Sequence, residues 1–243
     1  MSGDSGVGPG DPDRLPPPAV RTIGPIPPGA TRVVLIRHGE AVCNVEGIVG
    51  GERGCTGLSA RGLSQVTALA ERLALSGELV GVGALFASVL PRALETARII
   101  APALERWRSG PPLEVEADCT LCELHPGEAD GLTWPEFASR FSAPDWDVDP
   151  DQELAPGAES WTGFVDRAAA AVTDLADSHR GQLVVVACHA GVVEATMLRF
   201  LPLAPRTTRL GLRTEHASMT EWERSGDRWL LRRYNDTTPV WVA

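Results

Sequence analysis

Two short apolar runs limit what this chain can fold into. Residues 33–36 and 183–187 are continuous, rich in β-branched side chains and too short for a core helix. Runs of this kind form strands that are buried on both faces, as in a parallel sheet covered by helices. Amphipathic segments with helical spacing at 60–75, 91–106 and 160–178 supply such helices. We therefore predict a three-layer α/β/α sandwich around a mostly parallel central sheet with an antiparallel edge strand.

The two ends of the chain differ from its centre. Residues 1–30 are rich in Pro and Gly and have no periodic apolar pattern, so a disordered or extended tail is predicted. Residues 31–243 are predicted to form one α/β domain. Near the C-terminus, residues 214–223 and 228–235 are predicted to pair as antiparallel strands. These strands could supply an edge for a second copy, so a homodimer is one expected assembly.

Composition excludes several classes of partner. The formal net charge is −10, which argues against nucleic acid as the main ligand. No apolar run approaches the ~18 residues of a membrane helix, and the N-terminus has no basic-then-apolar leader, so we expect a cytoplasmic protein without a membrane partner. All 22 basic residues are Arg. Without lysine, any phosphate must be bound by Arg, His and backbone N–H groups.

Both buried runs end in a histidine that is followed shortly by a glycine. The segments are VVLIRHG, which contains Arg37 and His38, and VVVACHAG, which contains His189. In sheets of this class, ligands bind beyond the carboxyl ends of the strands. If the two strands are neighbours, ~4.8 Å apart, both imidazoles reach a common point. Arg92 follows a third strand-like run and Glu123 lies in a polar loop, so both side chains can approach the same edge.

Six segments between residues 31 and 201 resemble, in order, the signature blocks of the histidine phosphatase (phosphoglycerate mutase-like) superfamily. One RHG tripeptide would be weak support, whereas six ordered blocks are specific. The blocks are Arg37-His38-Gly39-Glu40 with Asn44, Leu58-Ser59-x-x-Gly62, SVLPRALETA from Ser88 to Ala97, Leu121-Cys122-Glu123 with Gly127 and Gly131, Pro156-Gly157-Ala158-Glu159-Ser160, and VACHAG from Val186 to Gly191.

The resemblance implies a metal-independent phosphomonoesterase that acts on a small phosphate ester, a phosphorylated metabolite, through a phosphohistidine. His38 would attack phosphorus, while Glu123 would protonate the leaving oxygen and then activate water. Arg37, Arg92 and His189 would hold the non-bridging oxygens. No metal ion and no other cofactor is expected, because guanidinium and imidazole groups supply the positive charge.

Three further positions of these blocks are expected to bind substrate or support the site. Asn44 would hydrogen-bond the phosphoryl group or the substrate, although it could instead cap a loop. The carbonyl of Gly39 would fix the tautomer of His38 by accepting a hydrogen bond from its other nitrogen. Ala190 stands where the family usually has Gly, next to the second histidine.

Two of the catalytic assignments leave alternatives open. Arg92 could pair with Glu95 or Glu123 rather than with a phosphate. Glu123 could be a supporting residue, in which case Glu128 or Asp130 would be the acid. The sequence alone does not choose between these arrangements, because all four carboxylates belong to matching or adjacent segments.

The segment between Glu123 and Ser160 bears on the type of reaction. It is short and acidic with Arg140 as its only Arg or Lys, whereas phosphoglycerate mutases of the family carry a longer insert with basic residues. Simple hydrolysis is therefore predicted over two alternatives, a cofactor-dependent phosphoglycerate mutase and a non-catalytic protein that binds phosphorylated ligands. Three tryptophans near this segment either line an apolar leaving-group pocket or pack the core: Trp134, Trp146 and Trp161.

The cysteines and the remaining histidines receive no catalytic role. The five cysteines are odd in number and, with no leader, predict reduced thiols. Cys119-x-x-Cys122 could indicate redox chemistry or zinc, but no second cysteine pair lies at zinc-site spacing, so packing is the predicted role. His125 is expected to act in specificity or to lie on the surface. The pattern leaves open whether His216 points to the site.

Overall fold

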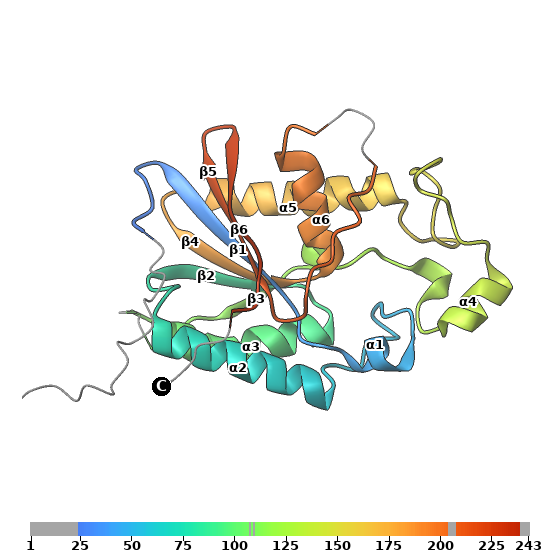
Figure 1. Cartoon of the computed structure of the whole chain (residues 1–243), viewed down its shortest axis with the longest axis horizontal. Coiled ribbons are helices and arrows are strands. Elements are labelled where there is room, and N and C mark those ends of the chain that lie inside the picture. The colour runs from blue at the N-terminus through green and yellow to red at the C-terminus, as the bar shows by residue number, and fades with distance from the viewer. Residues whose placement is uncertain (1–23, 107, 109, 204–207, 239–243) are drawn as a thin grey trace, which may run out of the picture.

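A six-stranded sheet forms the centre of the computed structural model, which describes residues 24–106, 108, 110–203 and 208–238 (Figure 1). The strands are β1 Ala30–Arg37, β2 Val82–Ala87, β3 Val115–Ala117, β4 Leu183–Cys188, β5 Met219–Ser225 and β6 Arg228–Asp236. Their order is β3-β2-β4-β1-β5-β6. The first four strands in this order run parallel, and β5 and β6 add an antiparallel edge. The predicted fold class is confirmed.

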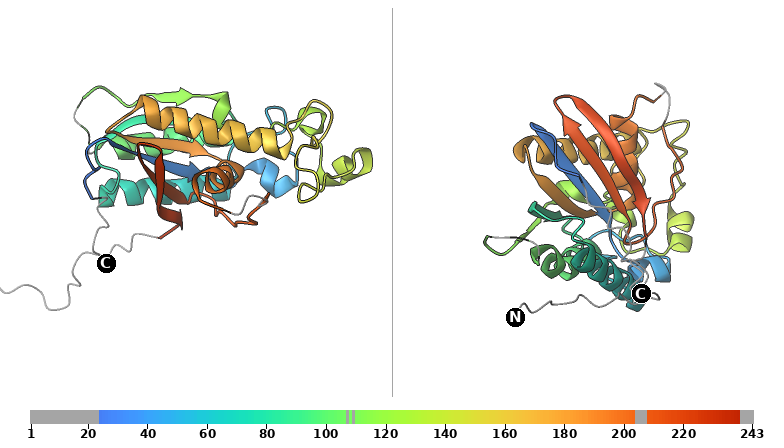
Figure 2. Two further views of the ribbon diagram at one scale, coloured as in Figure 1. Left: turned by 90° about the horizontal axis from the view of Figure 1, so that it is seen from above. Right: turned by 60° about the vertical axis from the view of Figure 1, so that its left-hand side comes forward.

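Helices cover both faces of the sheet (Figure 2). They are α1 Val42–Glu46, α2 Ala60–Ser76, α3 Pro91–Glu105, α4 Trp134–Arg140, α5 Trp161–Ser178 and α6 Ala190–Phe200, with short 3-10 helices at Cys119–Leu121 and Gly127–Ala129. Alternate residues of β1 face different helices: Val33 and Leu35 pack with α5 and α6, whereas Val34 and Ile36 pack with α2 and α3. All four side chains are fully buried, as a central strand requires.

Polar side chains fix where three of these helices begin. Ser59 caps α2, Ser160 caps α5, and Thr133 forms a capping box with Glu136 at the start of α4. A cap of this kind stabilises a helix by about 1 kcal/mol, because it satisfies an otherwise unpaired N–H group. Helices α1 and α4 lie together beyond the carboxyl end of β1, on the right of Figure 1.

Strands β1 and β4 are direct neighbours, so the condition under which their two histidines reach a common point is met. Their register pairs Arg37 with Cys188 at the carboxyl ends, and the His38 N–H donates to the Cys188 carbonyl at 2.9 Å. The next residues along the chain are therefore His38 after β1 and His189 after β4. The sheet places both imidazoles at one edge.

The late part of the chain differs from the prediction in one respect. Strand β5 begins at Met219 rather than at Thr214, so residues 214–218 form a loop. Ala217 turns this loop with a φ of 55°, in the left-handed region. Its N–H donates to the carbonyl of Arg37 at 3.0 Å. The loop therefore folds over the end of β1 instead of extending the sheet.

The predicted tail lies mostly outside the described residues, because the structure does not describe residues 1–23. The short part that is described packs on the domain. Ile26 lies against the core between the sheet and helices α2 and α3, and Arg32 donates to the Gly24 carbonyl at 2.6 Å. Among the described helices, none has the length and apolar composition that a bilayer span requires.

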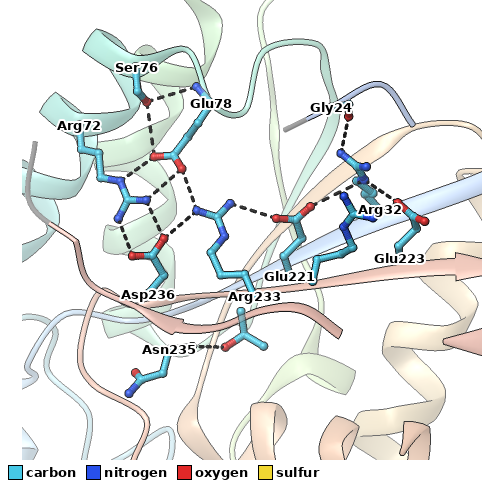
Figure 3. Close-up of polar contacts among 12 residues, drawn as sticks. Gly24, Arg32, Arg72, Ser76, Glu78, Glu221, Glu223, Arg233, Asn235 and Asp236 are labelled. Atoms are coloured by element: carbon cyan, nitrogen blue, oxygen red, sulfur yellow. Dashed lines mark hydrogen bonds and ion pairs between the residues drawn. The ribbon is translucent and has the colours of Figure 1, made fainter. Parts of the chain in front are cut away.

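A buried ion-pair network joins β1, β5 and β6 to α2 and the loop that follows it (Figure 3). Its guanidinium and carboxylate groups alternate, and each side chain is at most 10% exposed. The pairs are Arg32–Glu223 at 3.0 Å, Arg32–Glu221 at 3.7 Å, Arg233–Glu221 at 3.1 Å, Arg233–Glu78 at 2.7 Å, Arg233–Asp236 at 3.0 Å, Arg72–Glu78 at 2.6 Å and Arg72–Asp236 at 2.8 Å. The charges of these strands are thus compensated within the fold.

Candidate active site

Two imidazoles meet at the carboxyl ends of β1 and β4. The ring centroids of His38 and His189 are 5.1 Å apart, and the residues are 4% and 0% exposed. Beside them lies a cavity of about 530 Å³, and Arg37, His38, Arg92 and Glu123 all contribute to its wall. The fold thus brings together the five side chains that the sequence nominated for catalysis.

The ring of His38 is held by a contact on each nitrogen. Nδ1 lies 2.6 Å from the carbonyl oxygen of Gly39, and Nε2 lies 3.1 Å from Nε of Arg92. Because a carbonyl only accepts and a guanidinium only donates, we assign the proton to Nδ1 and the lone pair to Nε2. Burial lowers the pKa of His38 well below its usual value, and Arg92 and Arg37 lower it further. His38 is therefore a neutral imidazole with a nucleophilic Nε2.

Arg92 has no carboxylate partner among the described residues, although its guanidinium also hydrogen-bonds to Cys55. Its Nε donates to His38, and its Nη1 donates to the carbonyl of Gly50 at 2.7 Å. Glu95, the alternative ion-pair partner from the sequence, bonds elsewhere: its carboxylate accepts from the N–H of Leu58 at 2.7 Å. The Arg92 guanidinium, only 4% exposed as a residue, keeps its positive charge beside the cavity.

Arg37 is a second, partly buried cation. Its Nη1 donates to the Thr214 carbonyl, its Nη2 lies 2.9 Å from Nε2 of His216, and its Nε has no hydrogen-bond partner among the described residues. Burial lowers the pKa of Arg37, although attraction to Glu123 opposes that effect. The His216 ring centroid lies 5.7 Å from that of His38, and burial followed by Arg37 lowers the pKa of His216 to about 4. His216 therefore points to the site as a neutral group.

His189 has an unusual environment for a buried polar residue. Neither ring nitrogen has a hydrogen-bond partner within the described part of the chain. Burial lowers the pKa of His189 well below its usual value, and Arg92 lowers it further. Buried polar groups are nearly always hydrogen-bonded, so an unpartnered imidazole here indicates a place for polar atoms of a ligand. His189 also precedes α6, whose N-terminus carries the positive end of the helix dipole.

Glu123 is held by backbone donors. Its Oε2 accepts from the N–H of Gly191 at 3.1 Å, and its Oε1 accepts from the N–H of Leu124 at 3.2 Å. The approach to α6 depends on glycine, because a Cβ at position 191 would lie 2.1 Å from Oε1 of Glu123. The carboxylate is half-buried and lines the cavity.

The two alternative acids occupy other places. The carboxylate of Asp130 accepts from the N–H groups of Gly51, Arg53 and Gly54 at 2.8–2.9 Å, so it holds the loop at 50–54. Glu128 is exposed in a 3-10 turn. Because neither carboxylate contributes to the cavity wall, the geometry favours Glu123 as the acid.

The three predicted substrate-binding residues differ in what they contact. Asn44 accepts a hydrogen bond from the Ala41 N–H at 3.0 Å, which caps α1, and it also lines the cavity. Ala190 lines the cavity at the start of α6. Gly39 accepts from His38 through its carbonyl, donates its N–H to the Thr96 hydroxyl at 3.2 Å and does not line the cavity. The loop-cap alternative for Asn44 is therefore present together with its place in the cavity.

A cation and two aromatic rings form a further wall of the cavity. Trp146 and Trp161 are stacked, with centroids 5.5 Å apart. The Arg209 guanidinium lies 5.9 Å from the first ring centroid and 5.2 Å from the second. Trp134 lines the same cavity. Sequence reasoning named the tryptophans but missed Arg209, because no motif or periodicity surrounds it.

Comparisons with known proteins agree on one family. Residues 33–237 match the family described as "Histidine phosphatase superfamily (branch 1)". The chain is 31% identical over 213 residues to phosphoglycerate mutase-like protein 4 of Arabidopsis thaliana, covering 85% of each chain. It is 31% identical over 212 residues to the metal-independent phosphoserine phosphatase of the same plant, covering 86% of this chain and 82% of the relative. A mycobacterial glucosyl-3-phosphoglycerate phosphatase, solved with VO3, superposes with a TM-score of 0.69 at 27% identity, covering 84% of this chain and 98% of that chain.

Proposed function

The chain belongs to the histidine phosphatase superfamily (branch 1) and is a phosphoric monoester hydrolase, and from this premise we propose that His38 is its nucleophile and Glu123 its general acid. The observation that supports this most strongly is the state of His38. Its neutral ring presents the Nε2 lone pair to the buried Arg92 guanidinium, and the ring centroid of the unpartnered His189 imidazole lies 5.1 Å away. A phosphoryl group that replaced the Arg92–His38 contact would meet the nucleophile and its positive surroundings together.

The phosphoryl oxygens would be bound by Arg37, Arg92 and His189. Phosphoryl transfer needs little more from the protein than positioning and stabilisation of charge on the non-bridging oxygens. Guanidinium groups suit this task because their planar donors bind phosphate at two points. The Nε–H of Arg37 and the ring N–H of His189 are donors that lack partners among the described residues, and such oxygens would accept hydrogen bonds from them.

The reaction balances in two steps. First, Nε2 of His38 bonds to phosphorus while the ester P–O bond breaks, and Glu123 in its acid form gives a proton to the leaving oxygen. Second, the Glu123 carboxylate takes a proton from water, whose oxygen attacks phosphorus as the N–P bond breaks. The products are the alcohol and inorganic phosphate, and both side chains return to their starting states.

The aromatic wall supports a substrate with a small organic leaving group that carries its own negative charge. Stacked Trp146 and Trp161 offer an apolar surface, and Arg209 over these rings offers one cation. Two relatives are named for phosphoserine and for glucosyl-3-phosphoglycerate, which are both phosphomonoesters with a carboxylate. We therefore propose a phosphomonoester with a carboxylate on its leaving group as the substrate class.

A panel of phosphomonoesters tests the proposed roles through the release of phosphate. Replacing the nucleophile in His38→Ala should lower kcat by about 10⁴-fold or more. A radiolabelled, acid-labile phosphoprotein should be trapped by rapid quenching in the wild type alone. His179→Ala is a matched control, because His179 ends α5 and bonds to the Leu175 carbonyl, away from the cavity. Equal rates for wild type and His38→Ala would overturn the assignment.

A separate assay addresses the mutase reaction. With 3-phosphoglycerate and a catalytic amount of bisphosphoglycerate, we expect slow release of phosphate and no accumulation of 2-phosphoglycerate. Rapid formation of 2-phosphoglycerate without phosphate release would contradict simple hydrolysis.

Location and assembly complete the proposal. A cytoplasmic location is supported by the five cysteines, all of which are free thiols. A homodimer would be formed along β6, the outer strand of the antiparallel edge. Light scattering after size exclusion measures the mass directly, and a monomeric mass at working concentration would exclude that dimer.

A further inference from the structure

Three side chains of metal-binding type lie together behind the loop that carries Glu123. The sulfur atoms of Cys119 and Cys122 and a ring nitrogen of His125 all lie within 4.8 Å of one another. Cys119 is exposed and Cys122 is buried, so the cluster opens to solvent on one side only. Thiolate sulfur and imidazole nitrogen are the ligands that Zn²⁺ prefers in proteins. The fold adds the imidazole of His125 as a third ligand, which the isolated C-x-x-C pattern lacked.

One distance in the cluster matches tetrahedral coordination. Sγ of Cys119 lies 3.5 Å from Nε2 of His125. Bonds of ~2.3 Å from zinc to sulfur and ~2.0 Å from zinc to nitrogen, at a tetrahedral angle, place these two atoms about 3.5–3.6 Å apart. A metal ion could therefore be bound between them with little movement of either side chain.

The opposite side of His125 is held by a carboxylate. The backbone N–H of His125 donates to Oε2 of Glu159 at 2.9 Å, and the ring Nδ1 lies 3.5 Å from the same oxygen. Arg167 fixes Glu159 in turn, with contacts of 2.7 and 2.6 Å to its two oxygens. Metal-binding histidines commonly place their second nitrogen against a carboxylate, because this keeps the lone pair on the ligating nitrogen. Glu159 thus leaves Nε2 of His125 for Cys119 and a metal.

The backbone around the thiols is held by several further hydrogen bonds. Asp118 accepts from the Thr120 N–H at 2.8 Å and so caps the 3-10 turn that carries Cys119. Arg167 donates to the carbonyls of Thr120 and Cys122 at 2.8 and 3.1 Å. The Ser88 hydroxyl lies 3.1 Å from Sγ of Cys122 and donates to it. A donor at this sulfur also suits a thiolate, which is the ligating form.

We propose that Cys119, Cys122 and His125 bind one soft divalent cation, of which Zn²⁺ is the type, with water as the fourth ligand. Two thiol protons pass to solvent as the two metal–sulfur bonds form. Glu123 stands in sequence between two of the ligands, so the bound ion restrains the loop that presents this carboxylate to the cavity. The ion takes no part in phosphoryl transfer, and its binding does not depend on the proposed function.

Titration of the whole protein with Co²⁺ and then Zn²⁺ tests the site. In a chelator-treated sample with a phosphine reductant, one equivalent of Co²⁺ should give the visible bands of tetrahedral coordination and a thiolate-to-metal charge-transfer band. Zn²⁺ should displace it with a Kd below about 10 µM. Zn²⁺ at 100-fold above Kd should raise Tm by about 5–10 °C. Amide hydrogen exchange across residues 118–126 should slow in the same sample.

Four variants separate this site from other thiols. Cys119→Ser changes an exposed residue, so the protein should fold, and Co²⁺ charge transfer and Zn²⁺ stabilisation should both be lost. His125→Gln should abolish the tetrahedral spectrum, and Glu159→Gln should weaken binding by about 10–100-fold. Cys55→Ser is the matched control and should bind as the wild type does. The proposal is wrong if Kd exceeds about 10 µM, or if Cys119→Ser keeps the signal.

Discussion

Buried and partly buried arginines occur in two regions of this molecule, and the two regions differ in whether carboxylates compensate the charge. In the ion-pair network, Arg72 and Arg233 contact carboxylates at 2.6–3.1 Å. In the active site, Arg37 and Arg92 are bonded to carbonyls and to imidazoles. Burial lowers the pKa of Arg37, whereas for Arg72 and Arg233 the hydrogen bonds to carboxylates outweigh burial and raise the pKa.

The arginines paired with carboxylates stabilise the fold, whereas the arginines of the candidate site are placed to bind an anionic ligand. Removing one partner of a buried ion pair is costly, because the other charge is left without compensation. The network avoids that cost within the protein. The candidate active site carries the cost of an uncompensated charge while no ligand is bound, and the oxygens of a bound phosphoryl group would remove that cost. We therefore expect changes in the network to affect stability and changes in the site to affect activity.

The largest effect is expected from Arg92→Met. Loss of the guanidinium beside His38 should lower kcat/KM by about 10³-fold, because a cation that stabilises the transferring phosphoryl group is removed. The free energy of unfolding should stay the same or rise, since an uncompensated buried charge is lost with it. Steady-state kinetics and urea denaturation measure the two quantities on one preparation.

Arg98→Met provides the control for that substitution. Arg98 lies on the same helix, α3, and is exposed. Its replacement should leave both kcat/KM and stability near the wild-type values. A loss of activity in Arg92→Met below tenfold, or an equal loss in Arg98→Met, would remove the distinction between the two regions.

The opposite pattern is expected from Arg233→Met in the network. Glu78, Glu221 and Asp236 would lose a shared partner while buried, so the free energy of unfolding should fall by about 3–5 kcal/mol. The folded fraction should keep its kcat. Arg232→Met is the matched control, because Arg232 is 39% exposed and lies 3.7 Å from its nearest carboxylate. Equal destabilisation by both variants would show that the network is not what stabilises this edge.

The sequence predicted one of these regions better than the other, for a physical reason. His38 and His189 each follow a fully apolar strand, so strand ends and sheet adjacency were enough to bring them together. In β5, Glu221 and Glu223 flank the apolar Trp222, an alternation that normally indicates that the charged face is exposed to solvent. Their burial depends on Arg72 and Glu78 from a distant helix and loop, and no local pattern contains that information.

The missed parts of the site have the same origin. Residues 214–218 are predicted as strand because they directly precede β5. The left-handed backbone of Ala217 and its hydrogen bond to the Arg37 carbonyl instead turn these residues over the site. This turn brings His216 beside His38. Arg209 reaches the cavity from a segment without periodicity. Such contacts follow from tertiary packing, which single-sequence patterns do not encode.

The two regions should lose their contributions to folding stability over different pH ranges when the protein is titrated with acid. The pKa values of His38 and His189 are lowered from 6.5, so the unfolded chain binds more protons than the native one, and stability should fall as the pH drops below 6.5. Burial tends to raise the pKa of Asp236, but hydrogen bonds from Arg72 and Thr238 outweigh burial and lower it from 3.8. The contribution of Asp236 should therefore be lost only as the pH falls below about 3.9.

Measuring Tm against pH for two variants shows which group causes each loss of stability. His189→Asn should weaken the decline that starts at pH 6.5, because one buried imidazole no longer resists protonation. Asp236→Asn should lower Tm at neutral pH and flatten the decline below pH 3.8, where the wild type loses this pair. If His189→Asn leaves the upper decline unchanged, burial of the site histidines does not limit acid stability.

The smallest effect is expected from Arg209→Met, which extends the comparison to an exposed cation with no ion-pair partner among the described residues. Arg209 is exposed at the cavity wall, so solvent already stabilises its charge and its removal should not change the free energy of unfolding. KM for a phosphomonoester with a carboxylate on its leaving group should rise by about 5–10-fold, in keeping with one partly screened ion pair. KM for a neutral aryl phosphate, and kcat for both substrates, should stay at the wild-type values. An equal rise in KM for both substrates would mean that Arg209 shapes the cavity through its contacts with Trp146 and Trp161 rather than by binding an anion.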